Sequence, residues 1–437
     1  MASSLADGIA AYARTVLDAG GARAVAVAVT DRERTLAVHA GGEAEPGTMF
    51  QIGSIGKSFT AIVALQLVSE GRLDLHAPVA DVLPWFAVQG AAAPITAHHL
   101  LTHSAGIIRG SEISTACNYD VIELAGTSVG FQPGEHHWYS NVGYRAVGCM
   151  LERLTGAPYP RLVRERILDP LAMAESEPWI IPELRPRLAQ AYVPAYDDRP
   201  WRPEHGLVPG TWIDSAEADG CICTSAGDLA IYLRALMTRD PRLLGEAGWD
   251  AMLAPHVLDD QEGKGEHYGY GLTVTAAGLS HSGAMIGTES MMEAANDGLG
   301  AVAMATGPVW ADVLTGAALA LARGETPEPY VPKLDEPMTD DGSCPDEWGP
   351  FLGHYRSHNA WLTNFRVVAS GGGLVWGFDH LGSQREPLTP LADGSFRVGK
   401  DWSPERLTFD TVMDGSAQRA WLSGAAYHRS FRQSLPE

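Results

Sequence analysis

Ser54 and Lys57 are the residues of this sequence whose types and spacing could do chemistry together. They stand three apart in the stretch 51–60, QIGSIGKSFT, where a short apolar run ending in glycine precedes a long apolar one. From Ser58 to Glu70 the side chains are apolar nearly all round, which predicts a buried helix ending at Gly71. Positions three apart share a helix face, so the Lys57 amine is expected beside the Ser54 hydroxyl. Since burial disfavours a charged amine, this lysine could act as the base that makes the serine nucleophilic.

A serine and a lysine at this spacing are a weak signal alone, because a serine N-cap followed by a surface lysine gives the same pair. A second group, Tyr139-Ser140-Asn141, directly precedes a helical apolar run, which places Tyr139 and Asn141 at a helix entrance. The simpler alternative is that Asn141 is an N-cap and Tyr139 an ordinary loop aromatic. The neighbouring His136 and His137 are expected at the rim of any site.

The third group is His281-Ser282-Gly283. It lies in a run that is followed by a second run at 288–295, an Asn-Asp-Gly turn at 296–298 and a third run at 299–306. This pattern predicts antiparallel strands, with His281 inside a sheet.

The rest of the first 325 residues supplies the elements that would position these groups. Residues 24–30 and 35–40 alternate as a β-hairpin after a first helix, and residues 309–323 predict a closing helix. Helices at both ends of a region, packed on one antiparallel sheet, make an α+β layer arrangement.

Histidine and cysteine patterns argue against a metal site. His99 and His103 have the i, i+4 spacing of a zinc helix, but Leu100 stands where a metalloprotease would need its glutamate. Packing and helix-end hydrogen bonds are therefore the preferred roles for both histidines. The five cysteines are odd in number and sparse, as expected of reduced thiols in a reducing compartment.

Composition narrows the partners and the location. Among 437 residues, 53 are acidic and 31 basic, and the formal net charge of -22 disfavours nucleic acid and anionic membranes as partners. Residues 1–20 form an amphipathic pattern without the basic start and apolar run of a signal peptide, and no apolar run is long enough to span a bilayer. A cytoplasmic location without a membrane partner is expected.

The chain is too long for one ordinary core, so two domains are expected. Residues 324–349 are rich in proline and acidic residues without periodicity, which indicates a linker, and the short strand-like runs beyond it, separated by glycine turns, predict a small antiparallel β domain. The predicted boundaries are 1–325 for the larger domain, 326–348 for the linker and 349–437 for the β domain.

In this order, Ser54-x-x-Lys57, Tyr139-x-Asn141 and His281-Ser282-Gly283 resemble the three motifs of the serine β-lactamase and penicillin-binding-protein superfamily. The resemblance is closest to the class C β-lactamase-like branch, which includes D-aminopeptidases, carboxylesterases and amide hydrolases. It covers about residues 5–325 and includes supporting stretches at 71–75 (GRLDL), 100–106 (LLTHSAG), 169–173 (DPLAM) and 224–229 (TSAGDL). The β domain resembles, more weakly, the lipocalin-like C-terminal barrels of some D-aminopeptidase-like members.

The resemblance implies a fold and a set of roles. Ser54 would be the nucleophile at the base of a cleft between an all-helical region and the sheet, and Lys57 and Tyr139 would share its proton. Asn141 would bind the acyl-side amide of the substrate. The backbone N–H groups of Ser54 and Ala284 would form the oxyanion hole, where each donor is worth roughly 3 kcal/mol.

The third motif, His281 to Gly283, would contact the substrate, and it departs from the lactamase pattern. His281 replaces the lysine of Lys-Thr-Gly, and an imidazole is mostly neutral at pH 7, so a substrate carboxylate loses a charged partner. The Glu-x-x-Leu-Asn motif of class A enzymes does not occur in the sequence, so deacylation by a separate glutamate is not supported. The β domain could pack on the cleft and limit substrate size.

Three functions stay open. The first is a cofactor-free serine hydrolase that acts on an amide or ester of a small-molecule or peptide-like substrate, with poor β-lactamase activity. The second is an acyltransferase or cyclase that passes the same acyl group to an amine. The third is a non-catalytic sensor that stays acylated, which the presence of both Lys57 and Tyr139 disfavours. Oligomeric state and substrate stereochemistry cannot be read from the sequence.

Overall fold

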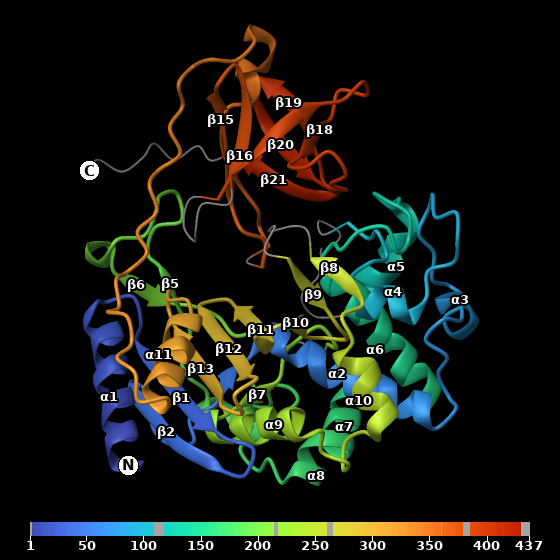
Figure 1. Ribbon diagram of the computed structural model, residues 1–437. Coiled ribbons are helices and arrows are strands. Elements are labelled where there is room, and N and C mark those ends of the chain that lie inside the picture. The colour runs from blue at the N-terminus through green and yellow to red at the C-terminus, as the bar shows by residue number, and fades with distance from the viewer. Residues whose placement is uncertain are drawn as a thin grey trace.

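The computed structural model describes residues 2–108, 118–213, 217–259, 265–359, 361–378 and 385–429. A large α+β part and a β-barrel stand one above the other, joined by a long extended segment (Figure 1). This arrangement agrees with the predicted fold class of an α+β region followed by a small antiparallel barrel.

The α+β part is built on one sheet of eight strands in the order β2-β1-β13-β12-β11-β10-β9-β8, in which neighbouring strands are antiparallel. The predicted first hairpin and the three runs after residue 278 are confirmed, since their patterns depend on local alternation and tight turns. The strands are β1 (Ala24–Thr30), β2 (Thr35–Gly42), β8 (Val257–Asp259), β9 (Glu266–Tyr268), β10 (Thr273–Thr275), β11 (Gly278–Met285), β12 (Thr288–Ala295) and β13 (Gly300–Thr306).

Helices cover both faces of this sheet (Figure 1). Strand β1 is buried along its whole length because its valines face α1 (Ala2–Asp18) and α11 (Asp312–Ala322), whereas its alanines join the core on the other face. The predicted packing of both terminal helices on one sheet is confirmed. The closing helix begins three residues later than expected.

Helix α2 (Gly56–Ser69) forms the centre of the helical region. Its apolar side chains from Phe59 to Leu67 are buried, and Phe59 stacks on Tyr232 with ring centroids 3.8 Å apart. The polar Ser58 and Thr60 hydrogen-bond with buried tyrosine hydroxyls, which removes the cost of burying them. The helices around it are α3 (Val79–Val82), α4 (Ala97–Leu101), α5 (Tyr119–Glu123), α6 (Asn141–Thr155), α7 (Tyr159–Val163), α8 (Asp169–Leu171), α9 (Ala226–Thr238) and α10 (Glu246–Leu253).

Short strands complete this part of the chain. The pair β5 (Tyr192–Pro194) and β6 (Leu207–Pro209) lies beside the sheet, and β3 (Phe50–Gln51), β7 (Cys223–Thr224) and β4 (Ser176–Glu177) form a small sheet directly before the Ser54 turn.

The C-terminal part is a closed barrel of eight antiparallel strands that follow one another in sequence order. Its interior is filled by aromatic and aliphatic side chains such as Tyr355, Phe365 and Trp376, so it is a packed core. The strands are β14 (Gly353–Arg356), β15 (Phe365–Ser370), β16 (Gly373–Gly377), β17 (Arg385–Pro390), β18 (Phe396–Val398), β19 (Arg406–Met413), β20 (Ser416–Leu422) and β21 (Ala425–Arg429). Five of the eight strands, β15, β16, β18, β19 and β20, lie at the strand-like runs of the sequence, which are 366–370, 374–378, 396–398, 406–411 and 419–423.

The segment between the two parts, residues 325–345, runs without helix or strand, and all of it is described. The domain boundaries at 325 and 349 stay a prediction. The barrel contacts the α+β part directly, because Trp402 stacks on His136 at 4.4 Å and the Trp138 indole N–H donates to Glu405 at 3.2 Å.

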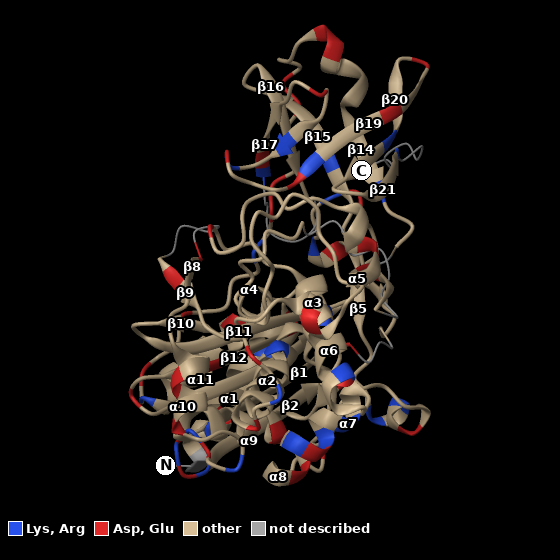
Figure 2. Cartoon of the chain, turned by 90° about the vertical axis from the view of Figure 1, so that its right-hand side faces the viewer, with Lys and Arg blue, Asp and Glu red and all other residues tan. Residues whose placement is uncertain are grey.

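Acidic and basic residues are interspersed over both parts of the chain (Figure 2). In the described segments, each helix is too short or too polar to cross a membrane.

Candidate active site

Ser54 lies in a one-turn 3-10 helix, Gly53–Ile55, that leads directly into α2. Gly53 has a φ of +50°, and a Cβ built on it would lie 2.6 Å from the carbonyl oxygen and 2.8 Å from the nitrogen of Ala284. A Cβ on Gly283 would lie 1.9 Å from the carbonyl oxygen of Ile52. Both glycines therefore permit β11 to press its backbone against the Ser54 turn, which brings the Ala284 N–H beside it.

Lys57 is fully buried, and its Nζ makes three short contacts. It lies 2.9 Å from Ser54 Oγ, 2.6 Å from Asn141 Oδ1 and 2.7 Å from the carbonyl oxygen of Asp219. A neutral amine has two hydrogens and one lone pair, and the Asn141 and Asp219 oxygens can accept only hydrogens. In this neutral form, the lone pair of Nζ can accept the proton of the Ser54 hydroxyl, which lies 2.9 Å away. The predicted proximity of the two side chains is confirmed.

Tyr139 and Asn141 reach the same place from the start of α6. The Tyr139 ring centroid lies 4.8 Å from Lys57 Nζ, and the ring packs on His103 at 4.2 Å. The alternative that Asn141 caps α6 is wrong, since the Ser140 hydroxyl caps it by accepting from the Gly143 N–H at 3.2 Å. Asn141, the first residue of the helix, keeps its side chain for Lys57 and the pocket.

The preferred packing roles of His99 and His103 are confirmed. His99 completes a capping box with Thr96 at the start of α4, and His103 Nδ1 accepts from the Ser140 N–H at 3.1 Å. Across the described ranges, no group of three or more His, Cys, Asp or Glu residues is placed to hold a metal ion. The four cysteines within those ranges form no disulfide, and Cys117 lies outside the described residues.

The expectation that His137 lies at a rim is wrong. It is 1% exposed, and its Nδ1 lies 3.2 Å from an Asp259 carboxylate oxygen. The neighbouring Trp138 and His136 turn to the barrel instead, so successive residues of this loop face opposite sides.

His281 lies on β11 as expected, and it is 6% exposed. Its Nδ1 donates to the Ser282 carbonyl at 2.5 Å and its Nε2 accepts from the Tyr268 hydroxyl at 2.8 Å, which fixes the neutral tautomer. Burial first, and the Lys57 amine in its protonated form second, lower the pKa of His281 to about 4. His281 is therefore neutral at pH 7. Ser282, next along the strand, is exposed.

The sequence motifs gave no indication of a buried ion-pair cluster that lies beneath the site. Arg145 on α6 pairs with Asp120 and, at 3.3 Å, with Asp219, and all three side chains are at most 7% exposed. Burial and the charge of Asp219 raise the pKa of nearby Glu217 to about 7. This cluster positions Asp219, whose backbone carbonyl accepts a hydrogen bond from Lys57 Nζ.

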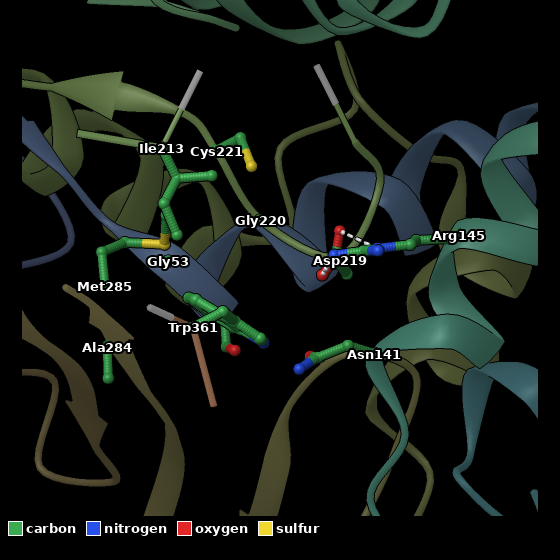
Figure 3. Close-up of a pocket in the computed structure, with 11 residues that line it drawn as sticks. Gly53, Asn141, Arg145, Ile213, Asp219, Gly220, Cys221, Ala284, Met285 and Trp361 are labelled. Carbon is green, nitrogen blue, oxygen red and sulfur yellow. Dashed lines mark hydrogen bonds and ion pairs between the residues drawn. The ribbon is translucent and has the colours of Figure 1, made fainter. Parts of the chain in front are cut away.

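A pocket with about 300 Å³ of empty volume opens beside Ser54 (Figure 3). Ser54, Asn141 and Ala284 of the predicted set line it, and Lys57, Tyr139 and His281 lie nearby. The remaining lining residues are Gly53, Arg145, Ile213, Asp219, Gly220, Cys221, Met285 and Trp361.

Sequence reasoning missed Asp219, Arg145 and Trp361. Asp219 acts through its backbone carbonyl, which gives no residue-type signal, and Trp361 belongs to the barrel. An arginine inside the apolar pattern of α6 was the one available hint of a buried ion pair.

Comparison with known proteins agrees with this geometry. A family model described as Beta-lactamase matches residues 9–325. Penicillin-binding protein 4* of Bacillus subtilis is 26% identical over 272 residues, which cover 56% of this chain and 57% of that protein. Esterase EstB of Burkholderia gladioli is 31% identical over 157 residues, or 31% of this chain and 40% of that protein. The chain thus spans little more than half of the length of the first of these relatives.

Among solved structures, the octameric penicillin-binding protein homologue from Pyrococcus abyssi matches with a TM-score of 0.66. The match covers 96% of this chain and 98% of that one at 23% identity. At this identity it establishes the fold, barrel included.

Proposed function

Because this chain belongs to the beta-lactamase family, we propose that it is a serine hydrolase that forms an acyl-enzyme at Ser54 and cleaves an amide or ester bond. One observation carries the proposal. The buried Lys57 Nζ lies 2.9 Å from Ser54 Oγ and is held by Asn141 and Asp219, which suits a base for that hydroxyl.

In the proposed reaction, Ser54 Oγ attacks the substrate carbonyl carbon while its proton passes to the pair formed by Lys57 and Tyr139. The carbonyl electrons move to oxygen, and the N–H groups of Ser54 and Ala284 stabilise this oxyanion. Collapse expels the amine or alcohol, which takes a proton from the same pair. Water then attacks the acyl carbon and gives a proton to the pair. Collapse of this second intermediate breaks the bond between the acyl carbon and Ser54 Oγ, and the acid leaves as the proton returns from the pair to Oγ.

The electrostatics of the site favour neutral esters and amides over β-lactams. His281 is neutral at pH 7, and the Arg145 charge is paired with Asp120 and Asp219, so neither supplies a ready cation for a substrate carboxylate. The likeness to a protein named as an esterase supports the same class. We further propose that the substrate is a small molecule or peptide-like, that the barrel is lipocalin-like, and that the protein acts in the cytoplasm.

A substrate panel tests this function. Chromogenic esters, D- and L-amino-acid anilides and one cephalosporin are assayed with the wild-type protein and with Ser54→Ala. We expect turnover of an ester or anilide, lost by several powers of ten in Ser54→Ala, and weak cephalosporin hydrolysis. Turnover that persists in Ser54→Ala would contradict the proposal. Adding an amine acceptor separates acyl transfer, which would yield the amide product, from hydrolysis.

A further inference from the structure

The barrel contributes one side of the Ser54 pocket. Trp361, between β14 and β15, lines the pocket and belongs to an apolar cluster with Ile213, Cys221 and Met285. Figure 3 shows the Trp361 ring lying across the pocket, with Met285 and Ile213 toward one side and Asn141 toward the other.

The two sides of the pocket differ in chemistry. Asn141, Arg145 and Asp219 form a polar side, where the Arg145 charge is taken up by carboxylates within the protein. The side formed by Trp361 and Met285 offers hydrocarbon, aromatic and thioether surface, which binds apolar groups by removing them from water. A substrate held here would turn its polar reacting group to one side and an apolar group to the other.

Contacts at both ends hold the Trp361 segment in place. The Trp361 N–H donates to Asn359 Oδ1 at 3.0 Å, and the Ser357 N–H donates to Asn364 Oδ1 at 3.1 Å. Asp197 of the α+β part pairs with Arg356 and accepts from Asn364 Nδ2 at 3.0 Å. These contacts anchor the backbone next to Trp361 before the substrate arrives, so little backbone ordering is required on binding.

We propose that Trp361 is a specificity residue, which forms the far wall of an apolar acyl pocket and restricts the substrate to a short apolar acyl group. The pocket belongs to the acyl side because Asn141, assigned to the acyl-side amide, lines it too. The inference rests on the proposed function, since the acyl group is the one that Ser54 would receive.

Trp361→Ala tests the proposal in the full-length chain. kcat/KM is measured for p-nitrophenyl acetate, butyrate and octanoate. We expect the ratio of the octanoate to the acetate kcat/KM to rise about tenfold or more over the wild type, because the added methylenes then find space. Trp361→Phe, which keeps an aromatic wall, should retain most of the preference for the short ester.

Trp402→Ala is the matched control. Trp402 is a tryptophan of the same barrel that stacks on His136 at 4.4 Å and contributes nothing to the lining of the pocket. Its removal should leave the ratio unchanged. Should Trp361→Ala not fold, Asp197→Ala loosens the anchor from outside the pocket and should raise the ratio by a smaller factor.

An unchanged ratio in the folded Trp361→Ala protein, or an equal rise in Trp402→Ala, would overturn the proposal. Either result leaves the hydrolase assignment standing as long as Ser54→Ala abolishes ester turnover. Ester turnover that survives in Ser54→Ala would instead overturn the proposed function itself.

Discussion

The polar and apolar sides of the Ser54 pocket are assembled in different ways. The polar side comes from residues around the starts of α2 and α6, from the Asp219 carbonyl and from backbone contact with β11, all within the α+β part of the chain. The apolar side joins Met285 of β11 to Trp361 of the barrel, so it depends on how two separate parts of the chain pack. We therefore expect that substitutions in the barrel can alter the apolar side of the pocket without changing the residues around Ser54.

The largest expected effect is on the polar side. Lys57→Ala and Tyr139→Phe should each lower kcat/KM about 100-fold or more, because each removes part of the group that carries the Ser54 proton. The double variant should cost little beyond the worse single one, because residues that act as a unit are not additive. Steady-state kinetics on one ester decides this, and additive losses would mean separate roles.

The next expected effect is on stability, and it concerns the buried ion pairs of Arg145 beneath the polar side. Asp120→Ala leaves the buried Arg145 charge with one partner fewer, and breaking such a pair costs about 3–5 kcal/mol of unfolding free energy. The matched control is Glu165→Ala, whose pair with Arg161 is 50% and 64% exposed and is worth at most about 0.5 kcal/mol. Urea unfolding measures both. Equal losses would mean that the buried pair does not stabilise the fold beyond a surface one.

A smaller effect is expected from restoring the lactamase charge. His281→Lys adds a cation near Tyr139, and a charge-assisted hydrogen bond is worth roughly 1.5–3 kcal/mol. Penicillin hydrolysis should therefore rise about ten- to a hundredfold, while ester turnover stays near the wild-type value. A parallel rise in both activities would contradict a selective carboxylate contact.

The low pKa of His281 predicts how the KM for a penicillin depends on pH. The pKa of His281 is about 4, so the imidazole stays neutral as the pH falls from 8 to 5 and gains its proton only below that range. The KM for a penicillin should thus show no improvement in the wild type between pH 8 and 5. A KM that falls with an apparent pKa near 6.5 would mean that His281 titrates as an exposed histidine.

Elements whose patterns act locally could be predicted from the sequence, whereas features that depend on tertiary packing could not. Helix α2, the β1–β2 hairpin and the strands around His281 were predictable, because periodicity and turn residues act locally. Strand β17 was missed because two prolines and charged residues mask its alternation. The burial of His137 was missed for a different reason, since it depends on β8 and β9 passing over the loop.

Within the site, the motif residues were predictable and their supports were not. The three-residue spacing of Ser54 and Lys57 predicts that both side chains lie on the same side of the helix start. The Asp219 carbonyl and the Trp361 ring reach the site through tertiary packing, from loops whose composition carries no chemical pattern.

The most direct test of the central claim is to find the residue that a fluorophosphonate labels. Ser58 is the nearest competitor in sequence, but its hydroxyl is buried and bonded to the Ile55 carbonyl and the Tyr232 hydroxyl. Peptide mass spectrometry should find one reagent per chain, on Ser54, and none in Ser54→Ala. Labelling of Ser58 or Ser282 in its place would contradict the assignment of Ser54 as the nucleophile.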